Sequence, residues 1–177
     1  MRRVMLILLA SQIVMVSLAA QSQPAAPQGR GRGAQAAEPA PPAPPPGSPG
    51  TYKSGADLMA VLKKATETSP DMSTSAVSNT DQYRINVVRR GKAAGAIAHP
   101  GNTELHYIID GAGTIVTGGT IVRPTGSNAA TATIDQGVTR HVTKGDVIII
   151  PPNTPHWYKD VEGSITYLEV RFVAPTK

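Results

Sequence analysis

The chain has 177 residues, of which 40% are hydrophobic and 4% aromatic, so it has room for one ordinary domain once non-globular segments are set aside. It contains no cysteine, which excludes disulfides, thiolate metal ligands, cysteine nucleophiles and lipoprotein attachment. The net charge of +5 is concentrated at the front, because the residues before position 51 carry +3 and leave +2 for the rest. A nearly neutral domain without a basic cluster excludes a nucleic-acid footprint.

The first 20 residues have the pattern of a secretory signal peptide. Two arginines precede an apolar run over residues 4–16, and small residues follow up to Ala20. The alternative is an uncleaved membrane anchor, because residues 4–20 are at the short edge of what spans a bilayer. Two polar residues interrupt the run and favour cleavage. We therefore expect a periplasmic or secreted domain, which meets a membrane only if the leader is uncleaved.

Residues 21–50 are rich in proline, alanine, glycine and glutamine and lack large apolar residues. This composition predicts a disordered linker, ahead of a folded domain over residues 51–177. At the start of that domain, apolar residues at helical spacing predict one short helix over residues 54–67, which Pro70 ends. We expect this helix to pack on the outside of the domain without a chemical role.

After residue 72 the sequence changes to short β-branched runs separated by glycine, proline and asparagine. The runs of strand length are residues 83–89, 94–99, 104–110, 114–122, 130–134, 140–144, 146–150, 156–159 and 164–172. Turn signals such as Asp110-Gly111 and Lys144-Gly145 lie between them. Many short strands at this spacing predict an all-β sandwich or barrel, and the double-sheet jelly roll has about eight strands.

Three of the four histidines lie where predicted strands begin or end. His99 ends one strand, Glu104 opens the next, and His106 follows two residues later. Because alternate strand residues share a face, Glu104 and His106 are expected to point the same way. His156 comes much later, after a proline-rich turn, whereas His141 falls within a strand and is expected to face solvent.

Two segments resemble the two motifs of the cupin family. In the first, His99 is followed after four residues by Glu104 and after six more by Gly111. In the second, residues 145–156, a glycine is followed after five residues by a proline, and His156 lies five positions further on. The resemblance covers about residues 80–172. It implies a cupin double-stranded β-helix, a jelly-roll barrel that binds one divalent metal ion inside, near an open end.

Carried over residue by residue, the resemblance makes His99, Glu104 and His156 metal ligands. The family's set is incomplete, because Ile97 stands where its first histidine is usual. His106 is the candidate replacement, which would give the metal set His99, Glu104, His106 and His156. The alternative is a core histidine that pairs with a polar neighbour or lines the pocket. Without His106, two histidines and one carboxylate still form the facial arrangement of non-haem iron oxygenases. A barrel that has lost its metal is the other alternative.

The implied function is a metal-dependent enzyme of the dioxygenase, decarboxylase or isomerase type that acts on a small molecule, and the fold alone does not select among these. The alternative is a non-catalytic module of the cell envelope that binds a small ligand or a metal. Histidine and carboxylate ligands suit iron, manganese, zinc, nickel and copper alike. Cupins often pair strand edges, so a homodimer is a further expectation.

Two pairs of residues near the predicted pocket complete the expectations. Glu169 and Arg171 share a face of the last predicted strand, and we expect an exposed pair on the outside of the domain. Tyr83 and Tyr167 offer hydroxyl groups to the pocket wall.

Overall fold

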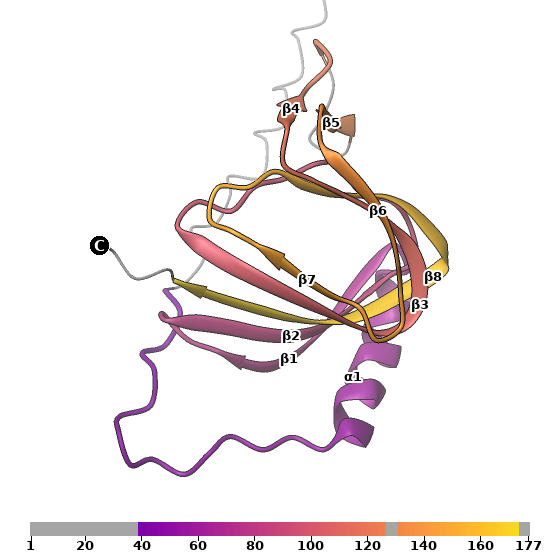
Figure 1. The fold of residues 1–177 in the computed structure, drawn as a ribbon. Coiled ribbons are helices and arrows are strands. Elements are labelled where there is room, and N and C mark those ends of the chain that lie inside the picture. Colours follow the sequence, from indigo (N-terminus) through magenta and orange to yellow (C-terminus); the bar gives the residue numbers. More distant parts are fainter. Residues whose placement is uncertain (1–38, 127–130, 174–177) are drawn as a thin grey trace, which may run out of the picture. The chain divides into compact units, whose positions relative to one another are not determined.

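The computed structural model describes residues 39–126 and 131–173. The predicted signal peptide, and the predicted linker up to residue 38, lie outside these ranges. The described elements, shown in Figure 1, are α1 (Gly55–Thr68), β1 (Met72–Asn79), β2 (Tyr83–Arg90), β3 (Asn102–Thr117), β4 (Thr120–Val122), β5 (Thr133–Asp135), β6 (Val138–Thr143), β7 (Val147–Ile150) and β8 (His156–Val173). No helix in the described ranges combines the length and the apolar character that crossing a membrane requires.

The described end of the predicted linker, residues 39–50, contains neither helix nor strand. It contacts the turn between β1 and β2 at Asp81. The Asp81 backbone N–H donates to the Pro41 carbonyl oxygen at 2.9 Å, and the Asp81 carboxylate accepts from the Ala43 N–H at 3.0 Å. These two hydrogen bonds attach this part of the proline-rich segment to the folded domain.

The predicted helix is confirmed as α1, and its start follows from a side-chain cap. The Ser54 hydroxyl oxygen accepts a hydrogen bond from the Asp57 backbone N–H at 3.1 Å, which satisfies one of the free donors of the first turn. Leu62 is the residue of α1 that becomes fully buried, at 1% exposure. The helix packs on β1, where Ser73 and Ser75 are buried. As expected, α1 carries no part of the candidate site.

Six strands form one antiparallel sheet in the order β1-β2-β8-β3-β6, and β7 also pairs with β3. β3 and β8, of 16 and 18 residues, pair along almost their whole length through several register shifts. Such irregularities bend a strand, and in Figure 1 both strands curve so that the sheet rolls over on itself. Strands β4 and β5 form a separate two-stranded sheet. This antiparallel architecture with one N-terminal helix agrees with the predicted all-β jelly roll.

Several predicted strand boundaries were wrong. The Asp110-Gly111 turn signal is a bulge inside β3, with Gly111 at φ +77°, so the chain continues instead of reversing. The two last predicted strands are likewise one strand, β8. The predicted strand 94–99 reduces to a single bridge between Ile97 and His156. β1 was missed because its buried positions are the small polar residues Ser73 and Ser75, which give no apolar signal.

The core lies inside the roll and grades into a polar cluster along one face of β3. Successive residues on that face are Glu104, His106 and Ile108, exposed by 1%, 2% and 0%. Ile108 belongs to the apolar core, whose buried members are Val88, Ile108, Ile115, Val142, Ile150, Tyr158, Ile165 and Tyr167. The alternation of a β-strand therefore places an ionisable pair at the edge of the core, one step from fully apolar packing.

Candidate metal centre

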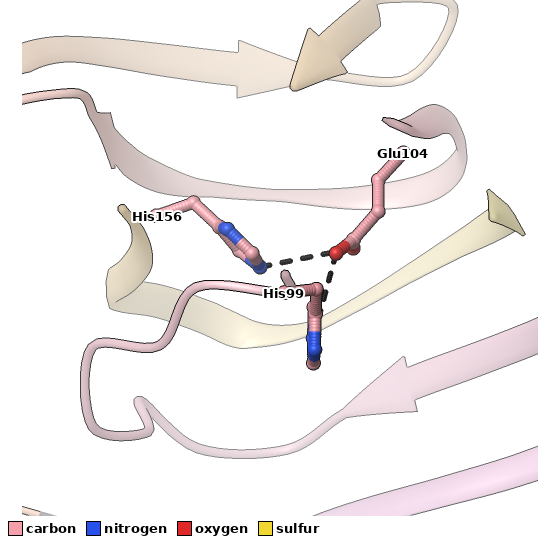
Figure 2. A group of neighbouring side chains, drawn as sticks. All are labelled: His99, Glu104 and His156. Atoms are coloured by element: carbon pink, nitrogen blue, oxygen red, sulfur yellow. Dashed lines mark ion pairs between the residues drawn. The ribbon is translucent and has the colours of Figure 1, made fainter. Parts of the chain in front are cut away.

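The Glu104 carboxylate is the centre of the cluster. It lies on β3 between Ile150 of β7 and Arg171 of β8. Its Oε1 is 3.4 Å from His99 Nε2, and its Oε2 is 3.4 Å from His106 Nε2 and 3.7 Å from His156 Nε2. Figure 2 shows His99 and His156 converging on this carboxylate from different segments. All four residues predicted as metal ligands thus come together.

Backbone hydrogen bonds hold the segment of Ile97 and His99 against the segment of Asn153 and His156. Ile97 donates to the His156 carbonyl at 3.0 Å and accepts from the His156 N–H at 2.8 Å. The Asn153 N–H donates to the His99 carbonyl at 3.2 Å. Ile97, which stands where the resemblance expects a histidine, therefore positions His156 through its backbone, and it lines the cavity.

The hydrogen bond at His156 Nδ1 determines which nitrogen faces Glu104 with a lone pair. Nδ1 lies 3.1 Å from the Thr154 carbonyl oxygen, which can only accept. The proton of the neutral ring is therefore on Nδ1, and Nε2 presents its lone pair toward the carboxylate. Two electron-rich atoms 3.7 Å apart in a buried site repel each other unless a cation or a proton lies between them. Donation from the second nitrogen to a carbonyl is the usual arrangement of a metal-binding histidine.

His106 has the opposite arrangement. Its Nδ1 lies 3.2 Å from the hydroxyl of Tyr158, which is 2% exposed. Burial raises the pKa of Tyr158, so the hydroxyl keeps its proton, and His106 Nδ1 is its hydrogen-bond partner within the described ranges. When the hydroxyl donates, the ring proton is on Nε2, which points at Glu104. This arrangement favours the alternative in which His106 pairs with polar neighbours and orients the carboxylate.

Several atoms of the cluster have no hydrogen-bond partner in the described chain. They are His99 Nε2, Glu104 Oε2, His106 Nε2 and Arg171 Nε. Leaving buried polar atoms unpaired costs about 1–3 kcal/mol each, so such groups usually surround a missing partner. Two sets of three side chains each bring their ligand atoms within 4.8 Å of one another. One set is His99, Glu104 and His156, and the other is Glu104, His106 and Glu169. The residues fit a metal ion.

The protonation states also suit a cation. Burial by itself raises the pKa of Glu104, but His106, His156 and Arg171 together hold that pKa below its ordinary value. Burial lowers the pKa of His99 and of His156, only partly offset by the Glu104 charge. At neutral pH these shifts favour an ionised Glu104 and neutral rings at His99 and His156, which are the ligand forms that metals bind.

The cluster opens onto a cavity of about 360 Å³. The expectation of an exposed Glu169–Arg171 pair was wrong. Both residues line this cavity, and Glu169 is only 9% exposed, because β8 pairs with β3 in a register that sets Glu169 beside His106 and Arg171 beside Glu104. The alternation of Tyr167, Glu169 and Arg171 with outward residues was a signal that could have identified them.

Of the remaining predictions about single residues, those for Tyr167 and His141 agree with the structure and that for Tyr83 does not. Tyr167 lines the cavity, whereas Tyr83 borders a separate hollow near Asp81. His141 is exposed as predicted and lies 2.8 Å from Glu162, away from the cluster. Arg84, Asn86 and Arg90 of β2 line the cavity as well, which the sequence reasoning did not foresee.

Comparison with known proteins identifies the family. The family model described as Cupin matches residues 63–166, more than half of the chain. The chain belongs to the cupin family. No curated protein matches this cupin.

Solved structures similar to this cupin include FeII HppE, with 15% identity, a TM-score of 0.45, and coverage of 58% of this chain and 51% of that chain. KdgF from Halomonas sp. has 15% identity and a TM-score of 0.43, covering 60% and 83%. Hydroxypropylphosphonic acid epoxidase from S. wedmorenis has 13% identity and a TM-score of 0.45, covering 58% and 51%. The match spans about half the length of the first of these structures.

Proposed function

We propose that this chain is an exported metal-dependent cupin enzyme that acts on a small molecule, with one divalent ion held by His99, Glu104 and His156. The carrying observation is the unprotonated His156 Nε2, which faces an ionised and buried carboxylate 3.7 Å away. When bound there, a divalent ion supplies Lewis-acid or oxygen-activating chemistry. The dioxygenase, decarboxylase and isomerase classes are all compatible with this donor set.

The other residues of the cluster prepare the ligands and the cavity. Tyr158 fixes the His106 ring, and His106 in turn faces Glu104 Oε2 at 3.4 Å. Together with His106 and His156, Arg171, 3.6 Å from Glu104 Oε1, holds the pKa of this carboxyl below its ordinary value. The cavity of about 360 Å³ is within the ordinary range of sites for small molecules. A small substrate can therefore lie against the ligands with much of its surface removed from water.

Export is proposed from the sequence pattern of residues 1–20 together with the proline-rich segment that follows it. Expression of the full chain in a Gram-negative host, followed by fractionation and N-terminal sequencing, tests this part. We expect a periplasmic or secreted protein that begins near residue 20 or 21. Recovery of the intact N-terminus from the cytoplasm would refute export without affecting the metal proposal.

The metal proposal is tested by metal analysis of protein purified without an affinity tag and then reloaded with single divalent metals. We expect about one ion per chain in the native protein, and its loss in Glu104→Gln and His156→Ala. His141→Ala is the matched control, since it removes the same residue type at an exposed position away from the cluster. A native protein that holds no ion with any metal, or equal loss in the control, would refute the site.

Catalysis is tested on the loaded protein with panels of small molecules for the three reaction classes. Turnover that disappears in His156→Ala supports the enzyme. Tight binding of a small molecule without turnover would instead support the non-catalytic module of the cell envelope.

A further inference from the structure

A row of inward side chains crosses the sheet beside the candidate metal centre. In the register of the sheet, Arg84 of β2 lies opposite Arg171 of β8, and Arg171 lies opposite Glu104 of β3. On the other side of Arg84 lies Asn79 of β1. All four line the cavity. The sheet register therefore places two guanidinium groups on adjacent strands, next to the carboxylate of the metal set.

Charges in this row are not balanced. Arg171 has two carboxylate neighbours, Glu104 at 3.6 Å and Glu169 at 3.4 Å. Arg84 is exposed at the edge of the cavity, and its side chain makes no ion pair or hydrogen bond within the described part of the chain. Like charges directly opposite each other on neighbouring strands destabilise a sheet. Glu104 and Glu169 offset the charge of Arg171, whereas the charge of Arg84 has no such neighbour in the described part of the chain.

The lining of the whole cavity also has an excess of positive charge. Its charged members other than histidine are three arginines and two glutamates, which leaves one positive charge in excess. The third arginine, Arg90, is already engaged, since its Nε donates to the Tyr167 hydroxyl at 2.9 Å and its guanidinium lies over the Tyr158 ring. A divalent cation at Glu104 would make the excess larger and would compete with Arg171 for the same carboxylate.

Arg171 faces the two carboxylates without a close hydrogen bond from its Nε. That nitrogen is buried and lies 3.6 Å from Glu104 Oε1, although the side chain as a whole is 17% exposed. A guanidinium group offers donors in a fixed fork that matches the paired oxygens of carboxylates and phosphates. Arg84 offers this fork at the edge of the cavity without a carboxylate neighbour, one strand away from Arg171, and this arrangement suits an oxyanion.

We infer that Arg84 and Arg171 form an oxyanion subsite that binds the carboxylate or phosphate group of a small anionic substrate beside the metal centre. The role of this group as part of a substrate rests on the proposed function. Binding of the anion itself does not require it, because both arginines are present with or without an ion. The subsite narrows the substrate class to small acids, and it excludes neutral molecules of the same size.

The test is titration calorimetry of the full chain with inorganic phosphate and with oxalate, first metal-free and then loaded. We expect saturable binding of at least one anion, tighter in the loaded protein, and about tenfold weaker in Arg84→Gln because one charged hydrogen-bond partner is lost. Arg89→Gln is the matched control. It removes the same charge from the same strand, at a position that does not line the cavity, and should bind as the native chain does.

Each outcome separates the two proposals. Metal content of Arg84→Gln should equal that of the native chain, since Arg84 contacts no ligand. Equal weakening in Arg84→Gln and Arg89→Gln, or no anion binding to either form of the native protein, would overturn the subsite. If the native protein takes up no metal on loading and still binds the anion through Arg84, the subsite is supported and the metal site is refuted. Preference for phosphate over oxalate would assign a phosphorylated substrate, and the reverse a carboxylic acid.

Discussion

Replacing His106 by phenylalanine separates an orienting histidine from a metal ligand. The phenyl ring retains the packing against Tyr167, whose ring centroid is 4.5 Å from that of His106, but it removes both nitrogens. The Tyr158 hydroxyl and Glu104 Oε2 then lose their neighbour in a region where both residues are at most 2% exposed. Glu104 Oε2 already lacks a hydrogen bond, so the cost comes from the Tyr158 hydroxyl. At about 1–3 kcal/mol for one unpaired buried group, we expect the metal-free protein to lose about 1–3 kcal/mol of its free energy of unfolding.

The effect on metal binding should be that of a residue that acts through Glu104. We expect unchanged stoichiometry and an affinity about 10- to 100-fold weaker, the range found when hydrogen-bond partners of metal ligands are removed. Pulsed electron paramagnetic resonance of the copper-loaded protein counts coordinated imidazoles. The count should be two in the native chain, two in His106→Phe and one in His156→Phe.

The reasoning is refuted if His106→Phe lowers the imidazole count or abolishes stoichiometric binding, because His106 would then be a ligand. Tyr158→Phe is the companion variant, since it removes only the hydroxyl that places the proton on His106 Nε2. It should retain the ion and the imidazole count while lowering the melting temperature.

Three further predictions concern pH, backbone and the ligand set. Burial lowers the pKa of His99 and of His156 in the fold, so the unfolded chain binds protons more readily. The free energy of unfolding should therefore fall as pH drops below about 6.5. Equal free energies from denaturant unfolding at about pH 7.5 and about pH 5.5 would contradict this. Gly111→Ala should cost about 3 kcal/mol or more, because its Cβ would overlap the Ser164 carbonyl, whereas Gly145→Ala, also at positive φ but in open space, should cost about 1 kcal/mol, as measured by the same unfolding assay. Ile97→His should raise the imidazole count from two to three and tighten metal binding at least about tenfold, because the backbone hydrogen bonds to His156 do not depend on the side chain. An unchanged count would contradict the inward placement of this side chain.

Most of the candidate ligand set could be predicted because its spacing is local. Glu104 and His106 share a face by strand alternation alone, and the motif around His99 places it one turn away. The short β-branched runs and turn signals predicted an all-β sandwich or barrel, and the resemblance implied the jelly roll. Turn signals could not distinguish the bulge at Gly111 from a turn, since glycine at positive φ serves both. β1 escaped because a strand covered by a helix can bury small serines such as Ser75 without an apolar pattern.

The sequence by itself determined the family, the fold class and the presence of imidazoles around one carboxylate, because these depend on motifs within short segments. Only the tertiary structure decided what each group does. The proton positions on His106 and His156 are set by Tyr158 and Thr154, and the charged row of Arg84 and Arg171 exists because β2, β8 and β3 pair in one register. Hydrogen-bond partners and cross-strand neighbours that are distant along the chain follow from the register of the sheet, which no local pattern specifies.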